Sequence, residues 1–395
     1  MTSDRRTLLL AAAGVLVLPG PALAARKKAL KCKGRVNYAG PPLRGQLAAW
    51  QFEAAAKAGA SRLAPVISDS LETSFEKAAG AMKASALTAA LATADGGIWT
   101  QTLTSSRGAP PPTSFFWASV GKACTATAIL QLVEEGKLTL DAPLSRWAPE
   151  MPNAAWITVE DLLAHTSGLY SFQADAALRA EPGYKSPERL LAVAAAQSAS
   201  FCPGAAWSYN NTGYVLLGRI IEALDGKPYH EALTKRIVER PDLRETTVLA
   251  PQQVPKGMAV PVVSGETDGA TDDVTTPYAA GTVAASAADV VRFWRAVMAG
   301  RLHGAEMTRR RFERLYPMAG VGPGYYGLGV MVSDLSAADP NATDTWLGHA
   351  GGLPGAKAMV AYSLEKQAFV AVALTGEGSP EATANLLLSG LPKKA

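Results

Sequence analysis

The sequence predicts an α+β fold in which one antiparallel sheet is built from both ends of the chain and a mainly helical lobe is inserted between them. Strand-like segments occur near the start and again near the end of the chain. Each group lies next to a helix-forming segment, and helical periodicity dominates the long middle. We therefore expect a central sheet flanked by N- and C-terminal helices. The sheet lobe would cover about 46–125 and 280–395, and the helical lobe about 126–279.

The first expected elements are a helix and a hairpin. Residues 71–82 have apolar side chains at helical spacing, whereas residues 86–93 alternate as a strand does. The turn-forming sequence Asp-Gly-Gly at 95–97 then leads into a returning strand over 98–104.

The helix expected over residues 119–135 has no polar face, because apolar side chains occur nearly all round it. It ends at Gly136, a typical helix terminator. A helix that is apolar on every side is usually buried. Ser119 and Lys122 are therefore expected at the start of a central helix rather than a surface one.

The rest of the helical lobe and the second half of the sheet follow from shorter patterns. Thr158 to Asp161 has the form of a capping box, and the helix that it starts is expected to close at Gly168. The remaining helices are expected over 186–197 and 212–240, after Ser286, and after Ser379 and Pro380, and the remaining strands over 326–332, 356–362 and 369–374, the last two joined as a hairpin around 365–366.

Ser119 and Lys122 form the first chemical motif, Ser-x-x-Lys. Residues three apart on a helix share a face, so the lysine amine can lie beside the serine hydroxyl. Burial lowers the pKa of a lysine, which can then remove the proton that makes serine a poor nucleophile. The helix N-terminus adds N–H groups where an oxyanion would form. About one or two such spacings are expected by chance in a chain of this length, so the motif alone is weak.

Two further motifs follow along the chain. Tyr209 and Asn211 form Tyr-x-Asn, in which a tyrosine near a lysine can relay a proton to a leaving group and an asparagine can hold the lysine and a substrate amide. His349, Gly351 and Gly352 form a glycine-rich strand edge that a substrate backbone can approach closely. Taken singly, each also fits an ordinary turn.

In the order Ser-x-x-Lys, Tyr-x-Asn, His-x-Gly, the three motifs resemble the serine β-lactamase and DD-peptidase superfamily, and most closely its class C branch, which also holds D-aminopeptidases and esterases. The stretches 162–169, 209–218 and 326–329 add to the resemblance, which extends from about residue 70 to the C-terminus. The resemblance implies a β-lactamase/transpeptidase-like fold and catalysis through an acyl-enzyme without a cofactor.

The resemblance also implies a role for each matching side chain. Ser119 would form the acyl-enzyme, and Lys122 and Tyr209 would share the general-base and general-acid work. Asn211 would orient the lysine and the substrate. His349 would line the site opposite the tyrosine.

The third motif departs from the usual Lys-Thr-Gly of these β-lactamases. The backbone N–H groups of Ser119 and Gly352, beside Gly351, would still form the oxyanion hole. However, Ala350 has no hydroxyl for a substrate carboxylate, and His349 holds an anion less well than lysine at neutral pH. This departure argues against an efficient β-lactamase. It fits an esterase or amidase better, or a peptidase that holds its carboxylate elsewhere.

The leading hypothesis is an exported serine hydrolase that acts on a small-molecule ester or peptide. The alternatives are a D-alanyl-D-alanine carboxypeptidase acting on cell-wall peptides, a weak β-lactamase, and a catalytically dead binding protein on the same fold. The intact Ser119, Lys122 and Tyr209 argue against the last of these, because a drifted site often loses one such residue.

Other functional classes find little support in the sequence. The net charge of +4 is too small to indicate a nucleic-acid partner. The chain has no Gly-x-Ser-x-Gly of an α/β-hydrolase and no metal or nucleotide motif, so neither a metal nor a cofactor is expected. His165, next to Thr166 and Ser167, also fits a catalytic histidine, but the resemblance makes it a structural residue at a helix end.

Residues 1–24 have the form of an export signal. Arg5 and Arg6 precede an apolar run over 8–18, and a small-x-small cleavage site ends at Ala24. The start resembles a twin-arginine motif, although an ordinary secretory signal fits nearly as well. No later stretch reaches transmembrane length, so we expect a periplasmic or secreted protein without a membrane span.

The next segment is basic and contains one of the three cysteines. Residues 25–45 carry cations without an acid and predict a solvated linker before a catalytic domain over 46–395, with binding to an anionic surface as the alternative. The cysteines are Cys32, Cys124 and Cys202. Their odd number and the size of the chain favour three reduced thiols, while a single pair formed after export stays open.

Overall fold

The computed structural model of the protein describes residues 30–44, 63–93, 97–105, 108, 110–240, 243–263, 273–318, 324–335 and 344–391. The expected signal peptide, residues 25–29 of the expected linker and the turn residues 95–96 lie outside this part of the chain.

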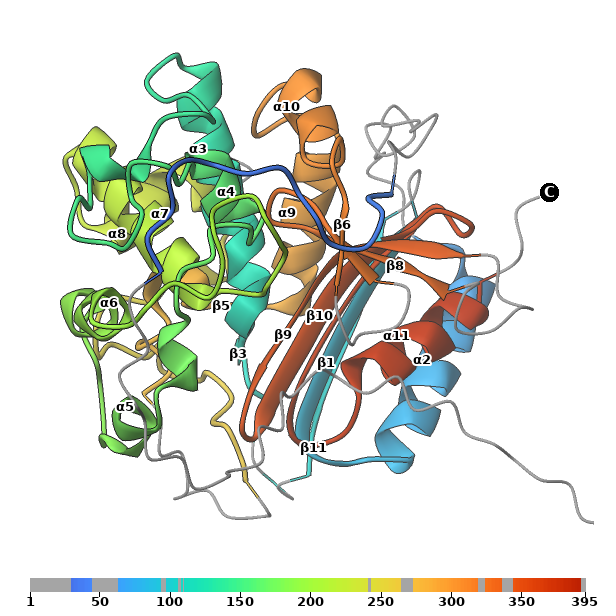
Figure 1. The fold of residues 1–395 in the computed structure, drawn as a ribbon. Coiled ribbons are helices and arrows are strands. Elements are labelled where there is room, and N and C mark those ends of the chain that lie inside the picture. The colour runs from blue at the N-terminus through green and yellow to red at the C-terminus, as the bar shows by residue number, and fades with distance from the viewer. Residues whose placement is uncertain are drawn as a thin grey trace, which may run out of the picture.

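One eight-stranded antiparallel sheet runs through the centre of the molecule, in the order β2-β1-β11-β10-β9-β8-β7-β6 (Figure 1). In β1, Lys83 lies opposite Glu377 of β11 and Thr93 opposite Ala368, so the two ends of the chain meet inside the sheet. The predicted sheet from both chain ends is confirmed. The strands are β1 (Lys83–Thr93), β2 (Ile98–Thr104), β6 (Tyr316–Pro317), β7 (Gly324–Tyr326), β8 (Met331–Asp334), β9 (Thr345–Leu353), β10 (Ala356–Ser363) and β11 (Ala368–Glu377).

Two helices cover the outer face of this sheet, α2 (Pro65–Gly80) and α11 (Pro380–Ser389), as Figure 1 shows. Successive residues of a strand point to opposite faces. Leu87 and Leu91 of β1 accordingly pack with these helices on the outer face, and Ala90 packs with the helical lobe on the inner face. The expected flanking helices are thus confirmed.

The helical lobe packs on the inner face of the sheet, and α3 lies at its centre with twelve of its fourteen residues buried. The predicted central buried helix is therefore confirmed. Within the described residues, no helix is both long and apolar enough to cross a bilayer. The helices are α3 (Gly121–Glu134), α4 (Val159–Leu163), α5 (Ala176–Ala180), α6 (Pro187–Ala195), α7 (Asn211–Asp225), α8 (Tyr229–Leu233), α9 (Ala287–Met298) and α10 (Ala305–Arg310), and a small second sheet contains β3 (Phe115–Phe116), β5 (Val283–Ala285) and β4 (Thr246–Val248).

Two expected helices are shorter than their patterns suggested. The single helix expected over 212–240 is divided, because α7 ends at Gly226 and Pro228 starts a new element with no N–H to continue the first. The predicted capping box of α4 is present. That helix ends before Gly168, because His165, with φ +63°, turns the chain away.

The single strand expected over 326–332 is also divided. It forms the end of β7 and the start of β8, joined by a tight turn at 327–330 in which the Gly327 N–H donates to the Val330 carbonyl (2.9 Å). Gly329 adopts φ +69°, and a Cβ there would lie 2.3 Å from the Ala126 side chain of α3. The glycine therefore allows the turn to pack directly on the central helix.

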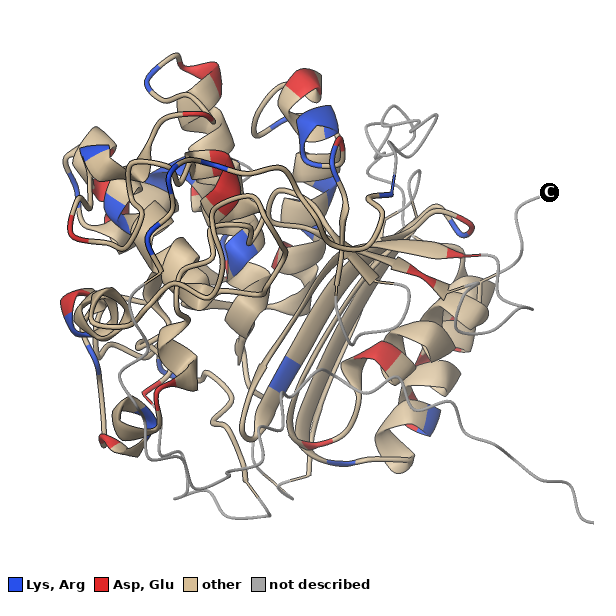
Figure 2. Cartoon of the chain, in the orientation of Figure 1, with Lys and Arg blue, Asp and Glu red and all other residues tan. Residues whose placement is uncertain are grey.

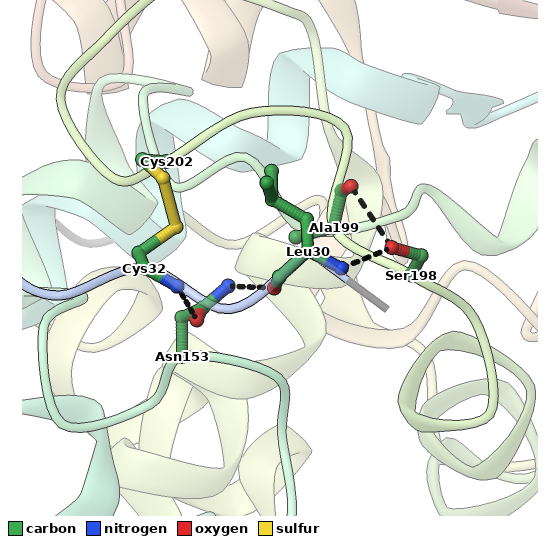
Figure 3. Close-up of a disulfide and its surroundings, with 6 residues drawn as sticks. All are labelled: Leu30, Cys32, Asn153, Ser198, Ala199 and Cys202. Atoms are coloured by element: carbon green, nitrogen blue, oxygen red, sulfur yellow. Dashed lines mark hydrogen bonds between the residues drawn. A yellow bond between two sulfur atoms is a disulfide. The ribbon is translucent and has the colours of Figure 1, made fainter. Parts of the chain in front are cut away.

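Cys32 and Cys202 form a disulfide between residues 170 positions apart (Figure 3). The expectation of three reduced cysteines is therefore wrong, and the alternative of one pair is correct. The Cys32 N–H donates to Asn153 Oδ1 (2.9 Å), and the Leu30 N–H donates to Ser198 Oγ (2.9 Å). These bonds hold the chain on both sides of the bridge.

Residues 30–44 form a segment that we call the strap. It crosses from the helical lobe to the sheet lobe along one side of the molecule (Figure 1, dark blue). Arg35 pairs with Asp161 (2.9 Å) in the helical lobe, and Arg44 pairs with Asp334 (2.8 Å) in the sheet lobe. The strap is largely exposed, as expected of a solvated linker, but it is fastened at both ends rather than free.

We expect protein purified from an oxidising compartment to contain one disulfide and one thiol that reacts only after unfolding. Cys124 is only 7% exposed, and a buried thiol is inert. Alkylation followed by mass measurement checks this: one label in denaturant, and three after reduction. Three labels in denaturant without reductant would contradict the disulfide.

Candidate active site

Ser119 lies on a single 3-10 turn, η1 (Ala118–Val120), immediately before α3, and is half-buried. The indole N–H of Trp117 donates to the Ala285 carbonyl (2.9 Å), which holds the turn against the small second sheet. Ala118 adopts φ +46°, a left-handed conformation that costs a non-glycine residue about 1–3 kcal/mol. The surrounding packing thus holds Ser119 on a strained turn at the helix N-terminus.

Lys122 is fully buried, and its Nζ donates to Ser119 Oγ (3.0 Å) and to the Ala280 carbonyl (2.7 Å). The rings of Tyr209 and Tyr214 lie 5.0 and 5.4 Å from Nζ. Burial lowers the pKa of Lys122 well below its usual 10.5, because a desolvated ammonium is disfavoured. Neither hydrogen-bond partner is a carboxylate that would oppose this change, so the surroundings favour the neutral amine.

Tyr209 lies at the end of the loop that leads into α7, and its hydroxyl is close enough to the Ser119 side chain to interact with it. Burial raises the pKa of the phenol, and the neighbouring Ser119 acts in the opposite direction but is the smaller effect. The pKa values of Lys122 and Tyr209 are therefore shifted apart. At neutral pH the lysine can accept a proton, and the tyrosine can donate one.

His165 lies in a buried aromatic layer beneath Tyr209, with ring centroids 4.4 Å from Tyr209 and 4.5 Å from Tyr326. Its Nδ1 accepts the N–H of Asn210 (3.1 Å), which places the proton of the neutral ring on Nε2. Burial lowers the pKa of His165, and the nearby Lys122 acts in the same direction. These contacts are those of a structural residue, as expected.

His349 is 2% exposed, and both of its ring nitrogens are occupied. Nδ1 lies 2.6 Å from the Ala350 carbonyl, which can only accept, so Nδ1 carries the proton. Nε2 then accepts from the Tyr326 hydroxyl (2.9 Å). Burial, assisted by Lys122, lowers the pKa of His349 to about 3. The ring is thus neutral.

The expected place of His349, lining the site opposite Tyr209, stays a prediction. The imidazole lies in the buried layer between sheet and helical lobe, 6.5 Å from the Tyr209 ring between centroids. The alternation of β9 points position 349 to the inner face of the sheet, the face on which Gly351 meets the serine turn.

Asn211 begins α7 and is 4% exposed. Its side-chain N–H donates to Gln173 Oε1, and its backbone N–H lies 3.4 Å from Ser171 Oγ. The expected contact between Asn211 and Lys122 is therefore not formed. The lysine amine donates to the Ala280 carbonyl instead, a backbone group that cannot be identified from a sequence motif. Asn211 Oδ1 is buried and receives no hydrogen bond from the residues that the structure describes, so it is available to another donor.

The edge of β9 lies directly against the turn that carries Ser119. β8 pairs with β9 only as far as Gly348, so among the described residues no strand pairs with that side of the residues that follow. A Cβ at Gly351 would lie 2.6 Å from the Ser119 nitrogen and 2.7 Å from the Trp117 carbonyl oxygen. Only glycine permits this approach, which places the exposed Gly352 next to the serine turn.

The structure thus brings the predicted residues together. Ser119, Lys122, Tyr209 and Asn211 meet the edge of β9 where the two lobes join, and His349 lies in the buried layer beside them. A buried amine beside a half-buried hydroxyl at a helix N-terminus is an arrangement suited to nucleophilic attack. In the described part of the chain, no group of three histidine, cysteine or acidic residues is placed to hold a metal ion.

Comparison with known proteins places the chain in one family. The model of the Beta-lactamase family matches residues 73–389. The chain is 33% identical over 171 residues to Esterase EstB of Burkholderia gladioli, covering 39% of this chain and 43% of that protein. It is 33% identical over 191 residues to Penicillin-binding protein 4 of Amycolatopsis lactamdurans, covering 45% and 49%. The matches span about half the length of these curated relatives.

Solved structures extend the comparison to whole folds. A D-stereospecific amidohydrolase from Streptomyces sp. is similar with a TM-score of 0.69 and 28% identity, over 82% of this chain and 99% of the other. A D-amino acid amidase from Ochrobactrum anthropi SV3, at 22% identity and a TM-score of 0.72 over 82% and 98%, shares the fold. Because the family model covers most of the chain, the protein belongs to the Beta-lactamase family and has the β-lactamase/transpeptidase-like fold that its motifs predicted.

Proposed function

We propose that the protein is an exported serine hydrolase that cleaves an ester or amide through an acyl-enzyme on Ser119. The observation that carries this proposal is the buried amine of Lys122, 3.0 Å from Ser119 Oγ, with a lowered pKa. Membership of a family with esterase and amidohydrolase relatives supports it.

Acylation begins when the neutral Lys122 accepts the Ser119 proton as Oγ attacks the substrate carbonyl carbon. The backbone N–H groups of Ser119 and Gly352 donate hydrogen bonds to the developing oxyanion. One such donor contributes about 10²–10³-fold to the rate. Tyr209 donates its proton to the leaving alcohol or amine, and the lysine ammonium returns a proton to the phenolate. Each proton transfer by a positioned side chain contributes about 10²–10⁴-fold.

Deacylation reverses the roles of the same groups. Lys122 or the tyrosine accepts a proton from a water molecule that attacks the acyl carbon. The proton then returns to Ser119 Oγ as the carboxylic acid product leaves. The water supplies the two atoms, O and H, that the product gains, so the cycle needs no cofactor.

The third motif favours a substrate whose group next to His349 and Ala350 carries no charge. His349 is uncharged and faces inward, and Ala350 has no hydroxyl. Lys357, opposite Gly352 in the sheet, donates instead to the Gly378 carbonyl (3.0 Å). We therefore place esters and amides before D-alanyl-D-alanine peptides or β-lactams, whose carboxylates need a partner.

An amide substrate is the second candidate, because Asn211 Oδ1 is a buried acceptor with no partner in the described part of the chain. A substrate N–H that donates to this oxygen would satisfy a group that otherwise costs about 1–3 kcal/mol to leave unpaired. The D-stereospecific amidohydrolase among the relatives is in keeping with this candidate.

Export is proposed from the signal-like residues 1–24. The disulfide between Cys32 and Cys202 supports it, because disulfides persist in oxidising compartments and are rare in the cytosol.

Replacing Ser119 by alanine should abolish ester hydrolysis. We expect release of p-nitrophenol from a short-chain ester to fall by at least about 10³-fold, because the nucleophile is lost. Ser105→Ala, an exposed serine after the far edge strand β2, is the matched control and should keep full activity. Equal activity in Ser119→Ala and the unaltered protein would show that another residue is the nucleophile.

The rate should rise with pH as Lys122 loses its proton. Since only the neutral amine accepts a proton, kcat/KM should fall about tenfold per pH unit below the pKa of Lys122, which lies well below 10.5. Lys122→Arg, whose side chain stays charged, should lose most activity and should no longer show this acidic limb of the pH profile. The limb should persist in His349→Gln, because the pKa of His349 is already about 3. An unchanged limb in Lys122→Arg would assign the base elsewhere.

A substrate pair that differs only in one charge tests the third motif. We expect a D-alanyl-D-alanine peptide ending in an amide or methyl ester to be cleaved at least about tenfold faster than the free acid, because the neutral His349 offers the carboxylate no counter-charge. Equal or faster cleavage of the free acid would require a cation outside the motif. Arg179, which donates to the Gln173 carbonyl (3.0 Å), would then be the residue to replace.

A further inference from the structure

The loop over residues 199–210, which we call the Tyr209 loop, contains neither helix nor strand, so its shape is set by what packs against it. On its inner side it rests on the turn around His165. The Ser208 N–H donates to the His165 carbonyl (3.0 Å), and the Asn210 N–H donates to His165 Nδ1 (3.1 Å). Tyr209 lies between these two bonds.

On its outer side the Tyr209 loop is covered by the strap. The Val36 N–H donates to the Pro203 carbonyl (3.0 Å), and the Ala39 N–H donates to the Ala205 carbonyl (2.8 Å). A Cβ at Gly204 would lie 2.4 Å from the Val36 carbonyl oxygen, so strap and loop are in backbone contact. The loop is thus held between two layers that are distant from it in sequence.

The disulfide is the first fastening of this arrangement. It joins Cys32 of the strap to Cys202, within the Tyr209 loop (Figure 3). Asn153 accepts from the Cys32 N–H at Oδ1 (2.9 Å) and donates to the Leu30 carbonyl (3.2 Å), which fixes the strap at the bridge and just before it.

The ion pair between Arg35 and Asp161 is the second fastening. The guanidinium makes two bonds to the carboxylate, Nε to Oδ2 (3.1 Å) and Nη2 to Oδ1 (2.9 Å). Asp161 is fully buried and also accepts from Thr166 Oγ1 (2.7 Å), next to His165. The strap therefore neutralises a buried carboxylate that is bonded to the turn beneath Tyr209.

The far end of the strap is tied to the sheet lobe. Arg44 pairs with Asp334 of β8 (2.8 Å) and its N–H donates to the Leu315 carbonyl (3.1 Å), while Tyr38 packs edge-on against Tyr316 at 5.2 Å between ring centroids. The strap thus spans the two lobes whose junction holds Ser119 (Figure 1), and the cations along it are drawn in blue in Figure 2.

We propose that the strap is a positioning element of the active site, which holds the Tyr209 loop so that the phenol faces Ser119. The Cys32–Cys202 disulfide and the Arg35–Asp161 pair are its two fastenings. This inference rests on the proposed function and deepens it. Displacing a reacting group by about 1 Å can cost about 10²-fold in rate, so release of the loop should slow catalysis before it unfolds the protein.

The first experiment is a set of double-mutant cycles on ester hydrolysis. Cys32→Ser/Cys202→Ser and Arg35→Ala are each made in the unaltered protein and in Tyr209→Phe. In the unaltered protein each should lower kcat at least about tenfold, with KM changing less than about threefold. In Tyr209→Phe the same changes should lower kcat less than about twofold further, because the group that they position has already been lost. Lys33→Ala, an exposed cation of the strap, is the matched control and should change neither constant.

Equal losses of kcat in both backgrounds would overturn the inference, since a merely stabilising strap acts independently of Tyr209. An inactive unaltered protein would instead contradict the proposed function. The strap is then tested on its own by hydrogen exchange at the Ser208 and Asn210 amides. Protection of these amides should fall on reduction, and unchanged protection would overturn the inference.

Reduction of the folded protein avoids variants that fail to fold. Dithiothreitol supplies two electrons and two protons, converts the bridge to the thiols of Cys32 and Cys202, and itself becomes a cyclic disulfide. We expect kcat to fall at least about tenfold and to recover on reoxidation, while Cys32→Ser/Cys202→Ser does not respond to the reagent. Full activity of the reduced protein would overturn the inference.

Discussion

The amine of Lys122 lies in the middle of the molecule, and the packing around it selects its neutral form. The helix that carries it has no polar face, so its first turn is buried with the rest. The nearest ionisable neighbours are themselves uncharged, because burial raises the pKa of Tyr209 and lowers those of His165 and His349. A base of this kind needs no carboxylate to orient it. It needs an acceptor such as the Ala280 carbonyl and a surrounding layer that keeps charge out.

The site also depends on a sheet that is built from strands at both ends of the chain. The serine turn precedes α3 on one side, and the edge of β9 reaches it from the other, separated by more than two hundred residues of sequence. The two approach so closely that position 351 must be glycine. Neither half of the chain makes the site alone, because the nucleophile and the neighbouring strand edge belong to different halves.

The sequence predicted best what depends on local pattern. The buried helix, the hairpin strands and the Ser119–Lys122 spacing all follow from periodicity within a few turns. What it missed depends on distant contacts. The Ala280 carbonyl carries no side-chain signature, and an odd number of cysteines does not show that Cys32 meets Cys202. The hydrogen bond from the Tyr326 hydroxyl to His349 Nε2 likewise joins residues that no local pattern links.

The bridge between Cys32 and Cys202 also closes the chain between them into a covalent ring, with a tail on each side. The ring contains both Ser119 and Lys122, and the C-terminal tail begins just before Tyr209. A single backbone cut anywhere inside the ring leaves both fragments joined through sulfur. Nucleophile, base and the loop bearing the phenol would therefore remain one covalent molecule after such a cut.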